Sequence, residues 1–375
     1  MALIWAFSRE AGGAEVLAPV IMALKKKHRV VLLAKDYAKN IFAKYSLSFV
    51  EIEGYSHSLM QHLIDKHGRP SLVLTSAVSL PWRDMTEKYL WRWSAEARIP
   101  SIAILDQWHN YAIRFSGVGE AERLKYLPDY VCVMDEYAKK DMIREGIPKT
   151  KIVVTGQPAF DSIPKYKKTF LKERYFKIRK KLGIKDEKMI LFVSESLKHD
   201  FGNSLGYTEV TTLQTVLNTL KRLADKNFKF VLVVKLHPQN KKEDFEKIDF
   251  DRYRSQFNVK FIHDELLPRD LALCSDVVIG MTSVLLVESI LLGKPTLSLQ
   301  INAKKDDILI ATRIGAIPLI SNVTDFERTL RSILVNKKYL SKYLKCQRKL
   351  CADGQAAKRV TQFVEAVLKK SGQGK

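Results

Sequence analysis

Polar side chains that can hold an anion follow two apolar runs in the second half of the chain. The run Phe230–Val234 leads to His237, and the run Asp276–Ile279 leads directly to Gly280, Thr282 and Ser283. In an open α/β sheet, ligands bind beyond the carboxyl ends of the strands, where main-chain N–H groups and the start of the next helix attract anions. The spacing therefore predicts a phosphate-binding crevice at these two strand ends.

A second polar group follows an apolar run in the first half. Asp106 comes directly after Ile102–Leu105, so we expect its carboxylate at the rim of a sheet, where it can take a proton from a hydroxyl. His109 can shuttle a proton or orient a phosphate, and Arg114 can clamp an anion. The other first-half carboxylates considered for acid–base work are Glu10 and Glu15.

Strand and helix patterns alternate from end to end, which is typical of parallel sheets with helical crossovers. The first half predicts strands at Leu3–Phe7, Arg29–Ala34, Leu72–Thr75, Ser101–Leu105, Tyr130–Met134 and Ile152–Thr155. The second half predicts strands at Met189–Val193, Lys229–Val234, Val259–Ile262, Asp276–Ile279, Thr296–Leu299 and Pro318–Ile320. We expect an α/β protein with two Rossmann-like, doubly wound parallel-sheet domains facing each other across a cleft.

Domain boundaries follow from the shifts in composition. Residues 1–160 form the expected first domain, and residues 161–188 form a polar, basic connector without a buried-strand run. Residues 189–355 form the second domain, and residues 356–375 form a C-terminal helix and tail that could pack on either domain.

Composition excludes several classes of protein. With 375 residues and 46% hydrophobic content, the chain can bury two domain cores. It has no apolar stretch long enough to span a membrane, and its first residues read as a strand rather than an export signal. Its four cysteines have no metal-ligand spacing, so we expect no metal, no cofactor and a cytoplasmic location.

The formal net charge of +22 predicts an attractive field for anions. Basic residues gather near Lys25, between Lys165 and Lys188, and near the carboxyl end, although such runs are most often solvated helix faces. No nucleic-acid-binding motif is present. Nucleic acid therefore ranks below phosphorylated substrates and the anionic inner face of a membrane, where peripheral contact is an expected property.

Several motifs resemble those of GT-B glycosyltransferases. The glycine-rich stretch Ser8–Glu15 follows the first strand, and the resemblance places Arg9, Gly12 and Gly13, with His109 and Arg114, on the acceptor side of the cleft. A tight strand-to-helix turn is the alternative reading. The segment Val153–Asp161 (VVTGQPAFD) is similar to the segment that closes the first domain in many GT-B enzymes and in nucleotide-sugar 2-epimerases, which places a hinge there.

The His-Pro and Thr-Ser pair resembles that of bacterial polysialyltransferases, capsule Kdo transferases and CDP-glycerol glycerophosphotransferases, where these motifs hold the nucleotide phosphate of the donor. The resemblance implies donor-binding roles for Gly280, Thr282, Ser283, Glu288, Ser194, Glu195 and Ser196, and a catalytic role for His237. Helix capping is the alternative for Thr282 and Ser283, and also for Ser194–Ser196.

The resulting hypothesis is a metal-independent glycosyltransferase that moves a sugar from a nucleotide-activated donor to an acceptor hydroxyl, in a polysaccharide or on a lipid-linked carrier. Asp106 and Glu15 are the candidate catalytic carboxylates of the first domain. The paired acidic motif that carries the general base in polysialyltransferases is missing, so the base is unassigned. Two alternatives remain: a nucleotide-sugar 2-epimerase or hydrolase of the same fold, and a nucleotide-sugar-binding protein without activity.

Overall fold

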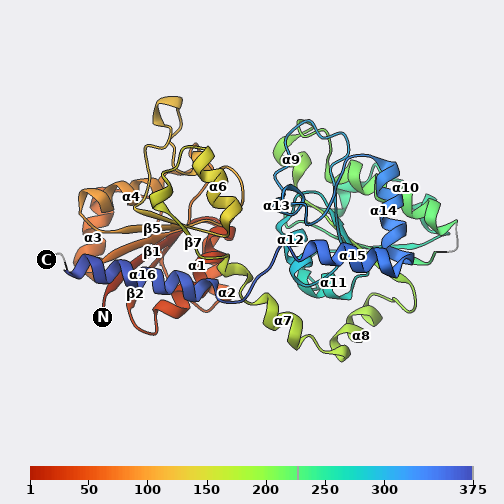
Figure 1. Cartoon of the computed structure of the whole chain (residues 1–375), viewed down its shortest axis with the longest axis horizontal. Helices are drawn as coiled ribbons and strands as arrows, with labels where there is room; N and C mark the ends of the chain where they lie inside the picture. Colours follow the sequence, from red (N-terminus) through yellow and green to blue (C-terminus); the bar gives the residue numbers. More distant parts are fainter. Residues whose placement is uncertain (226–227, 374–375) are drawn as a thin grey trace. The chain divides into compact units, whose positions relative to one another are not determined.

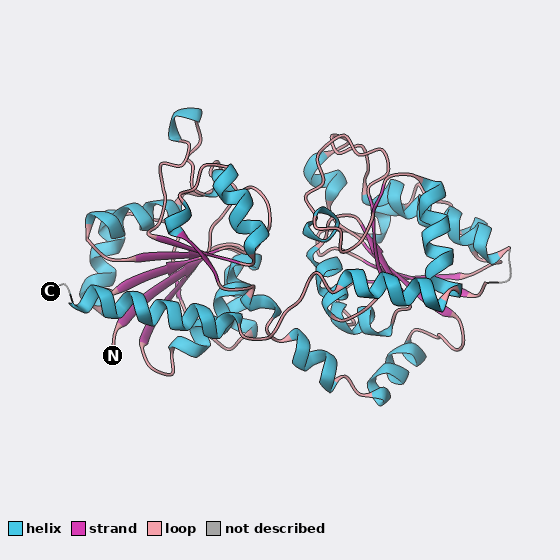
Figure 2. Ribbon diagram, in the orientation of Figure 1, coloured by secondary structure: helices cyan, strands magenta, loops and turns pink. Residues whose placement is uncertain are grey.

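The computed structural model describes residues 1–225 and 228–373 of the chain. The chain divides into two compact units: unit 1 comprises Met1–Ser162 with Ala352–Lys375, and unit 2 comprises Ile163–Cys351. Each unit is built on its own parallel sheet flanked by helices (Figures 1 and 2). The predicted fold class, two doubly wound parallel α/β domains, is therefore confirmed.

Unit 1 contains a seven-stranded sheet in the order β3-β2-β1-β4-β5-β6-β7. Its strands are β1 (Leu3–Ser8), β2 (Arg29–Ala34), β3 (Val50–Glu51), β4 (Leu72–Thr75), β5 (Ser101–Ile104), β6 (Tyr130–Val133) and β7 (Ile152–Val154). The strand order reverses at β1, which pairs with β2 on one side and with β4 on the other. Ligands of open α/β sheets bind beyond the strand ends at such a switch point, which here lies beyond β1 and β4.

The helices of unit 1 are α1 (Ala11–Leu24), α2 (Ala38–Lys44), α3 (His57–His67), α4 (Thr86–Glu96), α5 (Tyr111–Arg114), α6 (Glu136–Arg144) and α16 (Ala356–Gln373). Alternate residues of β1 point to opposite faces of the sheet. Ile4 and Ala6 pack with α1, α2 and α16, whereas Trp5 and Phe7 pack with α3 and α4. Both faces of the sheet are thereby buried, as expected of parallel strands with continuous apolar sequences.

Unit 2 contains a six-stranded sheet in the order β10-β9-β8-β11-β12-β13. Its strands are β8 (Lys188–Val193), β9 (Phe230–Lys235), β10 (Asn258–Ile262), β11 (Val277–Gly280), β12 (Thr296–Leu299) and β13 (Leu319–Ile320). The order reverses at β8, which lies between β9 and β11. Unit 2 therefore repeats the topology of unit 1, with its switch point beyond the ends of β8 and β11.

The helices of unit 2 are α7 (Ile163–Thr169), α8 (Lys172–Lys181), α9 (Leu197–Phe201), α10 (Glu209–Ala224), α11 (Pro268–Cys274), α12 (Val284–Leu291), α13 (Ile310–Arg313), α14 (Val323–Val335) and α15 (Lys337–Gln347). Side-chain caps begin several of them, including Thr208 at α10 and Asn322 at α14. The basic segment expected as a connector forms α7 and α8, which belong to unit 2. The C-terminal helix α16 belongs to unit 1, where Val360 and Val364 are fully buried.

No helix in the described part of the chain has the length and apolar character needed to cross a membrane.

Candidate functional site at the two switch points

The start of α1 packs closely against the switch point of unit 1. A Cβ atom on Gly13 would lie 2.6 Å from the Oγ of Ser76, and one on Gly12 would overlap the carboxylate of Asp106. Only glycine therefore allows the first turn of α1 to lie directly against the ends of β4 and β5. Gly12 and Gly13, expected on the acceptor side of a cleft, lie against Asp106 and Ser76 in the structure.

Asp106 lies at the rim of unit 1 and is paired with a buried cation. Arg114 donates to Asp106 Oδ1 at 2.9 Å and also to the main-chain oxygen of Ala77. The side chain of Arg114 is 3% exposed and that of Asp106 is 17% exposed. The arginine fixes the direction of this carboxylate, so Arg114 is a partner of the candidate base rather than a free clamp for a ligand.

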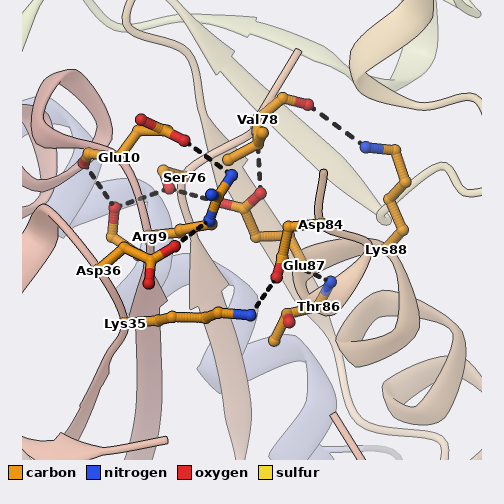
Figure 3. A network of polar contacts seen from close by, with 11 residues as sticks. Arg9, Glu10, Lys35, Asp36, Ser76, Val78, Asp84, Thr86, Glu87 and Lys88 are labelled. Carbon is orange, nitrogen blue, oxygen red and sulfur yellow. Dashed lines mark hydrogen bonds and ion pairs between the residues drawn. The ribbon is translucent and has the colours of Figure 1, made fainter. Parts of the chain in front are cut away.

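A network of polar contacts crosses the switch point of unit 1 (Figure 3). The hydroxyls of Ser8 and Ser76 lie 2.9 Å apart, and Ser76 donates to Glu87 Oε1 at 2.5 Å. Glu87 Oε2 accepts from the main-chain N–H of Val78 at 2.8 Å, and Lys88 donates to the oxygen of Val78 at 3.3 Å. Two ionisable side chains of α4 therefore hold the loop that follows β4.

Burial strongly perturbs both of these groups. Glu87 is 2% exposed, and burial raises its pKa to about 7, against the hydrogen bond from Ser76. Burial also lowers the pKa of Lys88 to about 8, against the attraction of Glu87. The sequence analysis missed Glu87 because an acidic residue in the first turn of a helix normally faces solvent and complements the helix dipole.

Arg9 and Glu10 lie next to this network, at the end of β1. Arg9 donates to Asp36 at 2.6 Å and to Glu10 at 2.9 Å. Burial raises the pKa of Glu10, against the attraction of Arg9, and the charges of Asp36 and Asp106 raise it further. Glu10 is thus a carboxyl group with a raised pKa that lies close to Asp106, whose own carboxylate is paired with Arg114.

Two other expected residues of unit 1 have contacts elsewhere. Glu15 accepts hydrogen bonds from Tyr45 at 2.7 Å and Lys44 at 3.2 Å, both near the end of α2. The structure thus turns Glu15 towards α2 and does not bring it into the network around Asp106. His109 is half-buried, and its main-chain oxygen accepts from Arg114 Nε at 3.4 Å.

In unit 2, the predicted anion-binding groups are bonded to the chain's own carboxylate. Glu195, at the end of β8, accepts from the N–H groups of Met281 at 3.1 Å and Thr282 at 2.8 Å, and from Thr282 Oγ1 at 2.6 Å. Burial raises the pKa of Glu195, against these hydrogen bonds, of which the one from the Thr282 hydroxyl is the strongest. The nest of N–H groups after β11 is therefore occupied by the side chain of Glu195.

The geometry around this nest is tightly determined. A Cβ on Gly280 would lie 3.1 Å from Leu286 Cδ2 and 3.2 Å from the oxygen of Val193, so glycine fits the strand end closely. Ser283 Oγ accepts from the N–H of Leu285 at 3.2 Å and caps α12. The capping alternative given for Ser283 is therefore what the structure shows for this side chain.

His237 lies at the end of the neighbouring strand, β9. Its Nδ1 accepts from the N–H of Gln239 at 3.3 Å, and burial lowers its pKa. The neutral ring therefore carries its proton on Nε2, which can donate to an oxygen of a ligand. Ser194 donates to Asn240 at 2.7 Å, which joins the end of β8 to the loop of His237.

Ser196 and Glu288 differ in their contacts. Ser196 is 4% exposed, and within the described residues its hydroxyl has no hydrogen-bond partner. Glu288 is paired with Arg269 of α11 at 2.7 Å and 3.2 Å. The structure thus brings Ser194, Glu195, His237, Gly280 and Thr282 to one edge, and pairs Glu288 with the adjacent helix.

In the described residues, no group of three or more His, Cys, Asp or Glu side chains is placed to hold a metal ion.

Comparison with known proteins identifies the family. The sequence profile of the UDP-N-acetylglucosamine 2-epimerase family matches residues 124–365, well over half of the chain. The chain belongs to this family. A search of the curated proteins gives no match.

Solved structures show the shared fold. UDP-GlcNAc 2-epimerase from Neisseria meningitidis bound to UDP-GlcNAc is 21% identical with a TM-score of 0.65, covering 98% of this chain and 100% of that chain. S. aureus MnaA with UDP is 16% identical with a TM-score of 0.68, covering 98% and 97%. A glycosyltransferase from Rickettsia africae is 13% identical with a TM-score of 0.67, covering 98% and 99%. The two-domain GT-B fold is thus common to both activities, and the fold alone does not separate them.

Membership of the epimerase family corrects the expected function. The glycosyltransferase hypothesis is wrong, because the family profile that matches the chain is that of the 2-epimerases, which the sequence analysis kept as an alternative. The misleading motifs were the His-Pro and Thr-Ser strand ends. They describe how a GT-B domain presents N–H groups and a histidine to a phosphate, and they contain no information on whether an acceptor is used.

Proposed function

We propose that the chain is a nucleotide-sugar 2-epimerase acting on a UDP-N-acetylhexosamine. The observation that carries the proposal is the family match over residues 124–365, which includes the whole polar edge of unit 2. The relatives with UDP and with UDP-GlcNAc support a uridine nucleotide as the bound group.

Inversion at C2 of the sugar requires that the C2 proton is removed from one face and that a proton is returned to the opposite face. Because no carbonyl group adjoins C2, the electron pair of the broken C–H bond must form a C1–C2 double bond and expel UDP, which adds back to C1 when the proton returns. Such a reaction needs one group that takes a proton and one that gives a proton. Unit 1 supplies a suitable pair. Asp106 is the proposed base, because Arg114 pairs with its carboxylate and fixes its direction, and Glu10 is the proposed acid, because burial raises its pKa.

We propose that the diphosphate of the nucleotide lies at the edge of unit 2. His237 Nε2 would donate to a phosphate oxygen, and the nest at Met281 and Thr282 would supply N–H donors. Glu195 now uses these donors, so a bound diphosphate would have to lie beside a protonated Glu195 or replace its carboxylate. The raised pKa of Glu195 favours protonation when a second anion approaches.

Incubation of the chain with UDP-GlcNAc as the only substrate tests the proposal, because an epimerase needs no acceptor. We expect proton NMR to show that the C2 epimer, UDP-N-acetylmannosamine, forms until its ratio to UDP-GlcNAc is constant. UDP binding without any epimer would instead support the remaining alternative, a nucleotide-sugar-binding protein without activity.

A further inference from the structure

The two successive helices α7 and α8 form a strongly basic segment; residues 163–181 are here named the basic helix pair (Figure 1). The segment contains seven lysines and two arginines against one glutamate, Glu173. A local excess of positive charge of this size attracts polyanions and anionic surfaces. It also repels itself, so the fold must hold it in place.

One side of the basic helix pair is fixed to the rest of unit 2. Asp270 of α11 accepts from Tyr166 at 2.6 Å and from Arg174 at 2.5 Å. Ile178 is buried, and Arg179 donates to the main-chain oxygen of Glu187 at 2.7 Å. Both arginines are therefore hydrogen-bonded to the rest of unit 2. The positive charge that a partner would meet comes mainly from the lysines.

Two large apolar side chains are exposed among the lysines of α8 and its start. Phe176 and Leu171 are each 64% exposed. On a helix, residues four positions apart lie on the same face, so Lys172 and Lys180 flank Phe176. Both lysines are exposed. A lone exposed apolar residue needs no explanation, but two large ones on a strongly cationic segment match the composition of helices that lie in a membrane interface.

We propose that the basic helix pair docks unit 2 on a bilayer with anionic headgroups, with Phe176 and Leu171 entering the interfacial layer. The lysines extend their ammonium groups to the headgroups while their methylene chains cover the apolar side chains. Charge complementarity selects an anionic surface. The exposed aliphatic Leu171, at the start of α8, favours lipid over nucleic acid, because bases stack on aromatic rings and not on leucine. This docking is independent of the proposed enzymatic activity.

Co-sedimentation with vesicles tests the proposal. We expect the full chain to pellet with phosphatidylcholine vesicles that contain about 30% phosphatidylglycerol at low salt, and not with pure phosphatidylcholine. Salt at about 0.5 M should release most of the protein, because it screens exposed charges. No binding to the anionic vesicles would overturn the proposal.

Matched variants locate the surface. We expect the triple variant Lys172→Glu, Lys177→Glu and Lys180→Glu to lose binding at least tenfold. The control Lys337→Glu, Lys338→Glu and Lys342→Glu changes the charge equally on exposed positions of α15 and should retain binding. An equal loss in both variants would mean that the overall field of the protein binds the vesicles, which contradicts a located surface.

An environment-sensitive dye tests insertion. With exposed Cys346 and Cys351 changed to serine, NBD attached at Phe176→Cys should brighten on addition of anionic vesicles, whereas NBD at Val335→Cys, also exposed, should not. If a short RNA, but not the vesicles, binds in a manner that depends on Lys172, Lys177 and Lys180, the partner is nucleic acid and the proposal fails.

Discussion

Both units bury a glutamate at their switch point, but the two glutamates do different things. Glu87 of unit 1 comes from a crossover helix and binds one N–H group and one hydroxyl of the loop after β4. Glu195 of unit 2 comes from the strand end itself and binds two successive N–H groups after β11. Glu87 thus holds the loop after β4 in place, whereas Glu195 occupies N–H donors that a phosphate would use.

This difference suggests a division of work between the units. Unit 1 presents carboxyl groups at its rim, namely Asp106 and Glu10, and suits proton transfer. Unit 2 presents N–H groups and His237 and suits anion binding. Substitutions in one unit should therefore change catalysis, and those in the other should change nucleotide affinity.

The largest effect is expected for Asp106→Asn, which keeps the shape of the side chain and removes the proposed base. We expect kcat for epimerisation to fall by about 10²–10⁴-fold, the usual contribution of a positioned general base. The affinity for UDP, measured by calorimetry, should stay within about twofold, since the expected phosphate contacts are in unit 2. A kcat reduced less than about tenfold would remove Asp106 from this role.

Gly13→Ala tests the close packing of the start of α1 against the end of β4. The added methyl group would lie 2.6 Å from Ser76 Oγ and would force the helix start away from β4. We expect the free energy of unfolding to fall by about 1–3 kcal/mol, as for other overpacked sites. Gly119→Ala is the matched control, because a Cβ there meets no atom within 4 Å. Equal denaturation midpoints for the two variants would argue against this account.

Glu87→Gln tests the burial of an ionisable group behind the unit 1 loop. The pKa of Glu87 is raised from 4.5 to about 7, so the folded state binds a proton more tightly than the unfolded state. Stability from this group is therefore present below pH 4.5 and is lost as the pH rises towards 7.

The glutamine variant lacks this titration. As the pH rises from 5 to 8, we expect the free energy of unfolding of the variant, measured with denaturant, to rise by about 2 kcal/mol relative to that of the original chain. A constant difference across this range would show that Glu87 does not titrate there.

Glu195→Gln tests whether the nest of unit 2 is the phosphate site. Removal of a negative charge beside a diphosphate should raise the affinity for UDP about tenfold at pH 8. The gain should shrink towards pH 5, where the original Glu195, with its raised pKa, can bind a proton as the nucleotide enters. Weaker UDP binding by the variant at both pH values would indicate that Glu195 contacts the ligand as a carboxylate.

The sequence was sufficient to predict the two sheets, because parallel strands buried on both faces leave continuous apolar runs. Each predicted strand overlaps an observed one, and among the strands of the described residues the edge strand β3, Val50–Glu51, was missed. The polar residues at the strand ends were also predictable, because chain order places them at one edge.

The contacts between these residues were not predictable. The occupation of the nest by Glu195 and the burial of Glu87 depend on side-chain directions that no spacing in the sequence encodes. The motifs also could not separate an epimerase from a glycosyltransferase. Both use a phosphate-binding edge on this fold, and the motifs describe that edge alone.

The most direct test of the account is exchange of the C2 hydrogen with solvent. UDP-GlcNAc is incubated with the chain in D₂O and C2 is followed by NMR. If unit 1 removes and returns the C2 proton, deuterium enters C2 of both epimers in the original chain, and this exchange is lost in Asp106→Asn. Epimer formation without deuterium at C2, or unchanged exchange in Asp106→Asn, would contradict the proposed mechanism.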